Sequence, residues 1–283
     1  MTNPLFSILI AQYNNGKYFE DCYKSIMAQT YDNWEVIIVD DGSSDDSVEI
    51  MRTFIGSDSR FKMEIFPKNQ GCGAAKRRLA ELATGEICAF LDPDDAITPE
   101  ALEIMVQEHK KHPDASMIYS RLIWCDEFLK VQNEGKTRQV ENGDPNFFDL
   151  EGSLTAFLSF KKSYYDKTGG IDRYLQRAVD RDLVLKLYET GSAYLLDKAM
   201  YMYRVHKKGI STNQNVDKAY FWFWVVIIAA AKRRNVNIED LFIEKALMSK
   251  RQIALEKEIS SYNESVIFKM FRKIGLFRLF TTS

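Results

Sequence analysis

Cysteine and histidine are rare in this chain of 283 residues, which holds 4 cysteines and 3 histidines. The cysteines form no Cys-x-x-Cys pair, so their spacing indicates neither a metal site nor a disulfide framework. Three of the four lie in or beside periodic apolar segments. We therefore expect all of them to be free thiols in a reducing cytosol, namely Cys22, Cys72, Cys88 and Cys125.

Long apolar runs are also missing. The longest candidate, residues 219–231, has 13 residues, whereas a helix that spans a bilayer needs about 20. No basic segment precedes the apolar residues Leu5–Ile10, and that stretch is too short for the core of a signal peptide. These absences predict a cytoplasmic protein that is soluble or lies at the inner face of the cell membrane.

No excess of one charge marks the whole chain, because 38 Lys and Arg residues face 40 Asp and Glu residues. This balance gives no footprint for nucleic-acid binding. The charges are unevenly placed, however. Residues 216–283 hold 12 basic and 7 acidic residues, a net charge of +5, whereas residues 1–215 carry −7. A basic tail on an acidic body indicates two different tasks.

What is present is a regular alternation of strand and helix patterns. Short β-branched apolar runs predict buried strands, and apolar residues at helical spacing predict helices between them. We expect strands at 5–11, 34–39, 61–66 and 87–91, and helices at 19–27, 47–54, 74–83 and from 98 onward. This order predicts an α/β domain with a mostly parallel, doubly wound sheet and flanking helices.

The remainder of the chain is less regular. We expect a strand at 115–124, a mobile polar loop or lid at 132–150, another strand at 155–160, a helix at 179–188 and helices throughout 216–283. The last segment is therefore interpreted as a C-terminal helical extension.

Acidic residues follow two of the expected strands. Asp40 and Asp41 end the second strand, and the sequence Asp92-Pro93-Asp94-Asp95 ends the fourth. Turns and helix caps also favour Asp, but carboxylates gathered at one edge of a sheet repel one another unless a cation lies between them. Carboxylates suit Mg²⁺ or Mn²⁺, which keep open positions for phosphate oxygens. No Walker-type loop is present, so the pattern favours nucleoside-diphosphate chemistry over ATP hydrolysis.

An ordered series of motifs spans residues 4–212 and resembles family 2 glycosyltransferases of the bacterial polysaccharide type. The series comprises Tyr13-Asn14, Gln29-Thr30-Tyr31, Val39-Asp40-Asp41-Gly42-Ser43, Asn69-Gln70-Gly71, Phe90-Leu91-Asp92-Pro93-Asp94-Asp95, Gly169-Gly170-Ile171-Asp172, Asp180-Arg181-Asp182 and Tyr203-Arg204-Val205-His206. The resemblance implies a GT-A fold, a nucleotide-sugar donor, a divalent metal (Mn²⁺ or Mg²⁺) and inversion at the anomeric carbon. The acceptor it implies is a saccharide or a lipid-linked saccharide.

The resemblance also implies roles for single residues. Tyr13 would lie against the nucleotide base and Asp41 would hydrogen-bond it. Asp94 would face the ribose, and Asp95 would bind the metal that bridges the diphosphate. Lys76, in a triplet where the family usually has Ala-Arg-Asn, is assigned to the donor. By the same reasoning residues 1–112 form the donor-binding half of the domain, 113–215 the acceptor and catalytic half, and 216–283 the extension.

The general base and the histidine that contacts the metal or diphosphate each have more than one candidate residue. An inverting transfer needs a carboxylate that takes the proton of the acceptor hydroxyl, and Asp180 is the first choice with Asp182 as the second. Two residues that are two apart on a helix do not share a face, so only one of them should point into the cleft. His206 is interpreted as a metal or diphosphate ligand, whereas His109 and His112 are expected to be solvated at a helix end.

The sequence is also compatible with two other functions, and it predicts one membrane contact. A sugar nucleotidyltransferase should carry a Gly-rich, Arg-containing loop where this chain has Gln12-Tyr13-Asn14-Asn15. A non-catalytic, membrane-peripheral protein that binds nucleotide sugars is the second alternative. Residues 265–283 combine basic and large apolar side chains without an acid, which favours contact with an anionic membrane over packing on protein.

Overall fold

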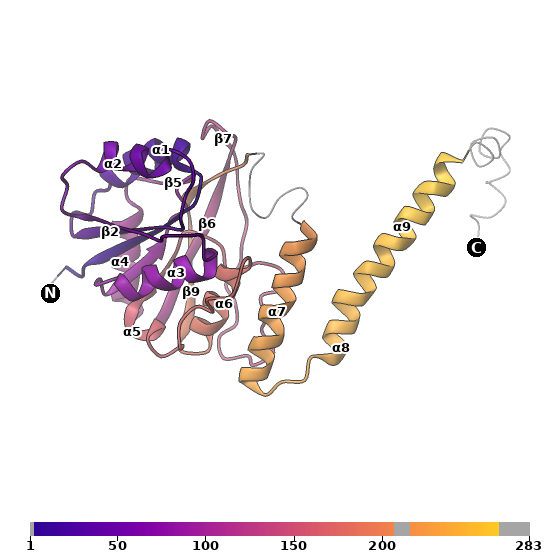
Figure 1. Cartoon of the computed structure of the whole chain (residues 1–283). Helices are drawn as coiled ribbons and strands as arrows, with labels where there is room; N and C mark the ends of the chain where they lie inside the picture. Colours follow the sequence, from indigo (N-terminus) through magenta and orange to yellow (C-terminus); the bar gives the residue numbers. More distant parts are fainter. Residues whose placement is uncertain (1–2, 207–215, 266–283) are drawn as a thin grey trace. The chain divides into compact units, whose positions relative to one another are not determined.

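The structure is a computed structural model and describes residues 3–206 and 216–265 (Figure 1). It contains two compact units, Met1–Arg234 and Asn235–Ser283. The first unit begins with β1 (Phe6–Gln12), η1 (Gly16–Tyr18), α1 (Phe19–Met27), β2 (Trp34–Asp40), α2 (Ser47–Ile55), β3 (Phe61–Ile65), α3 (Cys72–Leu82), β4 (Ile87–Phe90), β5 (Ala96–Ile97) and α4 (Ala101–Lys111). It continues with β6 (Ala115–Cys125), β7 (Val131–Glu134), β8 (Leu158–Lys161), α5 (Lys162–Tyr165), α6 (Val179–Tyr188), β9 (Ser192–Arg204) and α7 (Val216–Arg234).

Among the described residues, the strands form one nine-stranded mixed sheet in the order β3-β2-β1-β4-β8-β6-β9-β5, with β7 paired to β6. The N-terminal strands β3, β2, β1 and β4 are parallel to one another, and β6 is parallel to β9. Strand β8 runs antiparallel between β4 and β6. The expected α/β class and the alternation of the first hundred residues are therefore confirmed.

The core explains why the sequence forms this sheet. Both faces of β1 and β2 are buried, as the uninterrupted β-branched runs of these strands require. The even-numbered residues of β1, Phe6, Ile8 and Ile10, join one apolar cluster with side chains of α1, α2 and α4. Helix α3 packs on the opposite face of β1 and β2 and contacts α6, which in turn packs on α5 and α7. The four cysteines are free thiols.

The second unit is helical where it is described, with α8 (Glu239–Phe242), the π-helical turn η3 (Ile243–Leu247) and α9 (Met248–Glu264). The described residues from 216 onward are largely helical, as expected, but α7 belongs to the first unit, so the boundary of the extension at 216 stays a prediction. No helix within residues 3–206 and 216–265 is both long and apolar enough to cross a membrane. Residues 266–283, on which the predicted membrane contact depends, lie outside the described residues.

The middle of the chain differs from the sequence-based expectation. The stretch 132–150 is not a free loop, because β7 extends into it and Val140 and Phe148 are buried. The hydroxyl of Tyr188 donates to Glu141 O, and Tyr119 Oη donates to Arg138 O at 2.7 Å. Beyond β7 the segment is irregular, as expected for a loop, and side chains of β6 and α6 hydrogen-bond to its backbone; its mobility stays a prediction. The division of 1–112 and 113–215 into donor and acceptor halves stays a prediction.

Candidate active site

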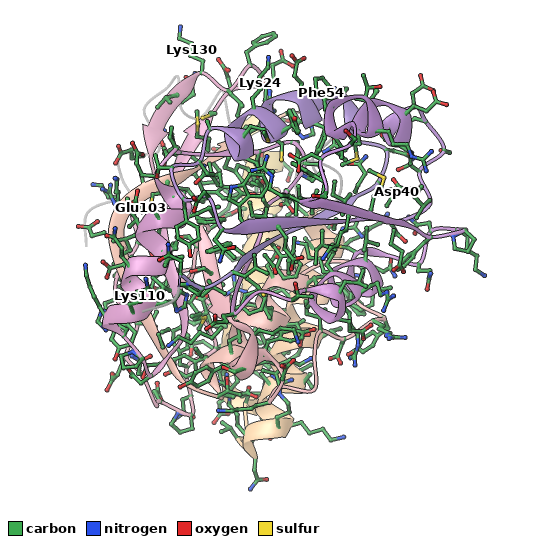
Figure 2. All side chains as sticks on the ribbon, turned by 90° about the vertical axis from the view of Figure 1, so that its left-hand side faces the viewer. Lys24, Asp40, Phe54, Glu103, Lys110 and Lys130 are labelled. Atoms are coloured by element: carbon green, nitrogen blue, oxygen red, sulfur yellow. The ribbon has the colours of Figure 1, made fainter. Side chains whose placement is uncertain are left out.

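Three parallel strands end at one edge of the sheet, and this brings the acidic motifs together. Strand β1 lies between its partners β2 and β4, with Gln12 opposite Asp40 and Leu9 opposite Phe90. The carboxyl ends of such strands are where ligands bind in open α/β sheets. The register therefore places the turn after β2 and the turn after β4 on both sides of the end of β1; Asp40 is labelled in Figure 2.

The two carboxylates that follow β2 hold turns. Asp40 accepts hydrogen bonds from the amide (2.8 Å) and hydroxyl of Ser43. The Asp41 carboxylate accepts from Gln70 N at 2.7 Å and Gly71 N at 2.9 Å, so it fixes the loop that leads into α3. Burial raises the pKa of Asp41 in spite of these two donors. Each of these carboxylates therefore accepts two hydrogen bonds from a neighbouring turn.

The residue that follows β1 is more exposed than the two carboxylates at the end of β2. Tyr13 is 48% exposed, which leaves its ring available to a planar ligand. Next to it, Asn14 N donates to Ser43 Oγ at 2.9 Å, and Asn14 Oδ1 accepts from Ser44 N at 2.8 Å. The turn that carries Tyr13 is thus tied to the turn after β2.

Arg204, at the end of β9, joins the acidic turn after β4 to the rest of the site. Its guanidinium donates to Asp94 O and Glu127 O, both at 2.6 Å, and to Asp21 Oδ2 at 2.8 Å. Its backbone amide donates to Asp95 Oδ1 at 2.7 Å. Arg204 is part of the Tyr-Arg-x-His motif, but its role could not be inferred from the sequence, because its partners come from three distant segments.

The two adjacent carboxylates of this turn lie in different surroundings. Asp95 is 2% exposed, and burial together with the charges of Asp92 and Asp94 raises its pKa well above the usual range. The Asp94 carboxylate instead reaches the imidazole of His206, with 2.8 Å between Oδ2 and Nε2. The ring of His206 also lies 4.9 Å from the ring of Tyr18. The turn therefore offers one buried carboxylate and one that is paired with an imidazole.

A second cluster joins this turn to α6. The ammonium of Lys76, on α3, lies 2.6 Å from Asp180 Oδ1 and 3.5 Å from Asp92 Oδ1. Asp180 lies in the first turn of α6, and its side chain is 73% exposed. Ala178, just before the helix, has a left-handed backbone with φ of 56°. Residues that are held in this sparsely populated region often occur at functional sites.

The carboxylate of Asp182 is buried, in contrast to that of Asp180, and is hydrogen-bonded. Its Oδ2 accepts from Lys186 Nζ at 2.7 Å and from Asp172 N at 3.0 Å, and its side chain is 1% exposed. Lys186 donates in addition to Gly170 O at 2.9 Å. Of the two acids that the sequence offers as a base, only Asp180 faces the solvent.

Arg181, between these two acids, fastens the segment 149–154 to the start of α6. Its guanidinium donates to the carboxylate of Asp149 at 2.7 Å and also to the carbonyl oxygen of Asp149. The same carboxylate accepts from Ser153 N at 2.6 Å. The guanidinium lies 5.1 Å from the ring of Phe223 on α7. The wall beside Asp180 is therefore built from α6, α7 and an anchored loop.

The sequence is similar to that of a known protein family and of several known relatives. The model of glycosyl transferase family 2 matches residues 7–167. TuaG of Bacillus subtilis, named for teichuronic acid biosynthesis, is 37% identical over 238 residues, which cover 79% of this chain and 88% of TuaG. Chondroitin synthase of Escherichia coli is 30% identical over 214 residues, which cover 74% of this chain. The first curated relatives are longer, and the chain covers 38% of EpsH from B. subtilis and 30% of chondroitin synthase.

Solved structures resemble the fold. Residues 1–349 of S. aureus TarS, in complex with UDP-GlcNAc, align with a TM-score of 0.66 at 19% identity, over 79% of this chain and 65% of that one. The mannosyltransferase PcManGT of Pyrobaculum calidifontis, in complex with GDP-Man and Mn²⁺, aligns with a TM-score of 0.57 at 16% identity, over 95% and 83%. The expected GT-A-like architecture is confirmed.

Proposed function

Because this chain belongs to glycosyl transferase family 2, we propose that it transfers a sugar from a nucleoside-diphosphate sugar to a hydroxyl of a saccharide or lipid-linked acceptor, with inversion, in the synthesis of a polysaccharide. One observation carries the proposal. An exposed carboxylate, Asp180, lies beside the acidic edge where three parallel strands end, and Lys76 links it to Asp92 on that edge. Donor and acceptor can thus approach from two sides of one cluster.

The donor side comprises the ends of β1, β2 and β4. We assign the nucleotide base to the exposed ring of Tyr13 and to Asp41, and the ribose and diphosphate to the turn that carries Asp94. The complexes of TarS with UDP-GlcNAc and of PcManGT with GDP-Man support a nucleotide sugar as the donor class. The relatives that synthesise chondroitin and hyaluronan support a saccharide acceptor.

One pair of side chains is best placed to bind the divalent metal. In residues 3–206 and 216–265 no group of three or more His, Cys, Asp and Glu side chains is arranged to hold an ion. Mg²⁺ and Mn²⁺, however, often use one or two protein ligands and take the others from substrate phosphates and water. Asp94 Oδ2 and His206 Nε2, 2.8 Å apart, are close enough to contact one ion. Asp95, the ligand expected from the sequence, is buried, whereas the Asp94 side chain is 20% exposed, so we favour Asp94 with His206.

When bound, the ion would neutralise the charge that develops on the leaving nucleoside diphosphate. The protein's own part in the reaction is proton transfer. As the acceptor oxygen bonds to the anomeric carbon, its proton passes to the carboxylate of Asp180. The bond from the anomeric carbon to the diphosphate oxygen breaks, and its electron pair leaves with the diphosphate. A single displacement of this kind inverts the anomeric configuration.

A panel of nucleotide sugars tests the donor class. A ligand that binds only the folded protein raises its melting temperature by mass action. We expect at least one nucleoside-diphosphate sugar to do so in the presence of Mn²⁺, and to release its nucleoside diphosphate when saccharide acceptors are added. Conversion of the nucleotide sugar, with added pyrophosphate, to nucleoside triphosphate and sugar 1-phosphate would indicate a nucleotidyltransferase, and binding without release would indicate a non-catalytic protein.

We further propose that residues 265–283 contact an anionic membrane, a proposal that rests on the sequence alone. The segment contains Lys269, Arg272, Lys273 and Arg278 among large apolar side chains. The full-length chain should cosediment with phosphatidylglycerol-containing liposomes, and less so as salt is raised. The double substitution Lys269→Glu and Lys273→Glu should weaken this binding and leave donor turnover unchanged. Equal cosedimentation of both proteins would assign the segment to protein packing instead.

A further inference from the structure

Lys76 is a buried lysine in the middle of the proposed site. It projects from α3, which lies next to α6 (Figure 1), and it is 4% exposed. Its ammonium bonds to Asp180 Oδ1 at 2.6 Å, lies 3.5 Å from Asp92 Oδ1, and is 5.1 Å from the centre of the Phe90 ring. The sequence predicts that this residue binds the donor, yet its shortest contact is with the proposed base.

The charges of this cluster keep Lys76 an ammonium ion. Burial of a lone ammonium is costly and by itself lowers the pKa of a lysine. Here the attraction of Asp180 and Asp92 outweighs burial and holds the pKa of Lys76 well above its ordinary value. The lysine therefore acts on both carboxylates as a fixed positive charge.

The contact with Asp180 uses only one carboxylate oxygen. Within the described part of the chain, the structure gives Asp180 Oδ2 no hydrogen-bond partner, whereas Oδ1 bonds to Lys76. An Asp side chain that is 73% exposed would otherwise exchange between rotamers in water. The tether leaves one oxygen open to an acceptor hydroxyl and fixes the direction in which it points.

We propose that Lys76 is a positioning residue for the general base, an inference that rests on the proposed function. Lys76 holds Asp180 by one carboxylate oxygen, so that the other oxygen receives the acceptor proton. It also links the base to Asp92 on the donor side. In the transfer step the proton moves from the acceptor hydroxyl to Oδ2, and the ammonium of Lys76 neither gains nor loses one. Its effect on the rate passes through Asp180.

A donor ligand and a positioning residue differ in what their loss changes. Loss of a donor contact weakens binding of the nucleotide sugar, whether or not Asp180 is present. Loss of the tether leaves donor binding nearly unchanged and lowers kcat, because a displaced catalytic group costs up to about 10²-fold in rate. Lys76→Met removes the ammonium and keeps most of the side-chain volume, and Lys76→Arg retains a cation.

The deciding experiment is a double-mutant cycle with Lys76→Met and Asp180→Asn in the full chain. The readouts are the Kd of the nucleotide sugar selected in the panel, from thermal shift with Mn²⁺, and kcat from release of its nucleoside diphosphate. We expect Lys76→Met to lower kcat about 10- to 100-fold at a nearly constant donor Kd, and Lys76→Arg to restore part of the rate. In the Asp180→Asn background, Lys76→Met should change kcat less than about threefold, since the group on which it acts is gone.

Lys186→Met is the matched control. Lys186 is also buried and also bonds two aspartates, Asp182 at 2.7 Å and Asp172 at 3.2 Å. Its loss should lower the melting temperature and leave kcat per folded molecule unchanged. Should this variant fail to fold, Lys62→Met, which removes the partner of Glu35, takes its place.

The outcomes separate the two proposals. If Asp180→Asn turns over donor like the wild type, the base assignment fails, and with it the proposed mechanism. If Asp180→Asn is impaired but Lys76→Met multiplies the loss by the same factor in both backgrounds, only the positioning role fails. A weaker donor Kd in Lys76→Met with kcat unchanged would return Lys76 to the donor site.

Discussion

Asp180 and Asp182 lie two residues apart on α6, and their carboxylates occupy opposite surroundings. The side chain of Asp180 is 73% exposed, whereas that of Asp182 is 1% exposed and bonded to Lys186. Helical geometry turns residues with this spacing to different faces. One acid is therefore available to a substrate, and the other connects α6 to the segment that precedes it.

Asp182 should matter for stability and not for chemistry. Asp182→Asn leaves the ammonium of Lys186 buried with less compensation, and breaking a buried ion pair costs about 3–5 kcal/mol. We expect the melting temperature to fall by roughly 6–20 °C, with kcat per folded molecule within about threefold of the wild type. Thermal unfolding and turnover at a temperature where both proteins are folded check this. Asp197→Asn, which changes an 82% exposed carboxylate that pairs with Arg121, is the control and should shift both quantities little. Loss of turnover at an unchanged melting temperature would make Asp182 the base.

The pair formed by Asp94 and His206 predicts how the protein depends on metal. His206→Ala should raise the Mn²⁺ concentration that half-saturates donor binding by about tenfold or more, because the ion loses a protein ligand. Titration of Mn²⁺ at a fixed concentration of nucleotide sugar, followed by thermal shift, measures this. His112→Ala, which removes a ring stacked on Tyr194, should leave the titration unchanged. Donor turnover that survives in EDTA would contradict a metal-dependent mechanism.

Glu35 predicts how stability depends on pH. Burial alone would raise its pKa, but hydrogen bonds from Lys62, Thr84 and Ser7 outweigh this and lower the pKa from 4.5 to about 2. A carboxyl with a depressed pKa stabilises the fold above its unfolded pKa, and that contribution is lost as the pH falls toward the folded value. The wild type should thus lose unfolding free energy from about pH 4.5 down to pH 2. Glu35→Gln should be less stable at pH 7 and flatter over this range in urea titrations, and the exposed Glu151→Gln should follow the wild type.

The segment 149–154, which Arg181 holds against α6, should be cleaved by a protease mainly when it detaches from this helix. Arg181→Met removes the guanidinium that bonds to Asp149, so the segment around the exposed Glu151 should open more often. Cleavage after Glu151 by a glutamate-specific protease should become about tenfold faster or more. Arg138→Met removes only the exposed partner of Glu151 and should change the rate little. Equal cleavage of all three proteins would mean that Arg181 does not hold the loop.

Much of the acidic edge at the ends of β1, β2 and β4 could be predicted from the sequence, because it depends on local patterns. Continuous apolar runs mark β1 and β2 as buried strands, and acids stand at the end of β2 and shortly after β4. The helix expected at 179–188 coincides with α6. Parallel strands that are joined through helices end at one edge, so the sequence places the turns of Asp41 and Asp94 at the same edge of the sheet.

The arrangement of the chain after α4 could not be predicted in the same way. Strand β9 contains Asp197 and Lys198 near its middle, and its pairing with β6 shifts register, so no clean alternation marks it in the sequence. The loop at 132–150 is polar in composition, yet its few apolar residues are the ones that anchor it. Lys76 and Asp180 are 104 positions apart, and only the packing of α3 on α6 reveals their contact.

The turnover of Asp180→Asn tests the central claim most directly. The variant keeps the size of the side chain and removes the basic carboxylate, so donor binding with Mn²⁺ should stay nearly intact. Release of nucleoside diphosphate in the presence of acceptor should fall by about 10²- to 10⁴-fold, the usual contribution of a general base. Turnover equal to that of the wild type, at equal donor affinity, would contradict the assignment of Asp180 as the base of an inverting glycosyl transfer.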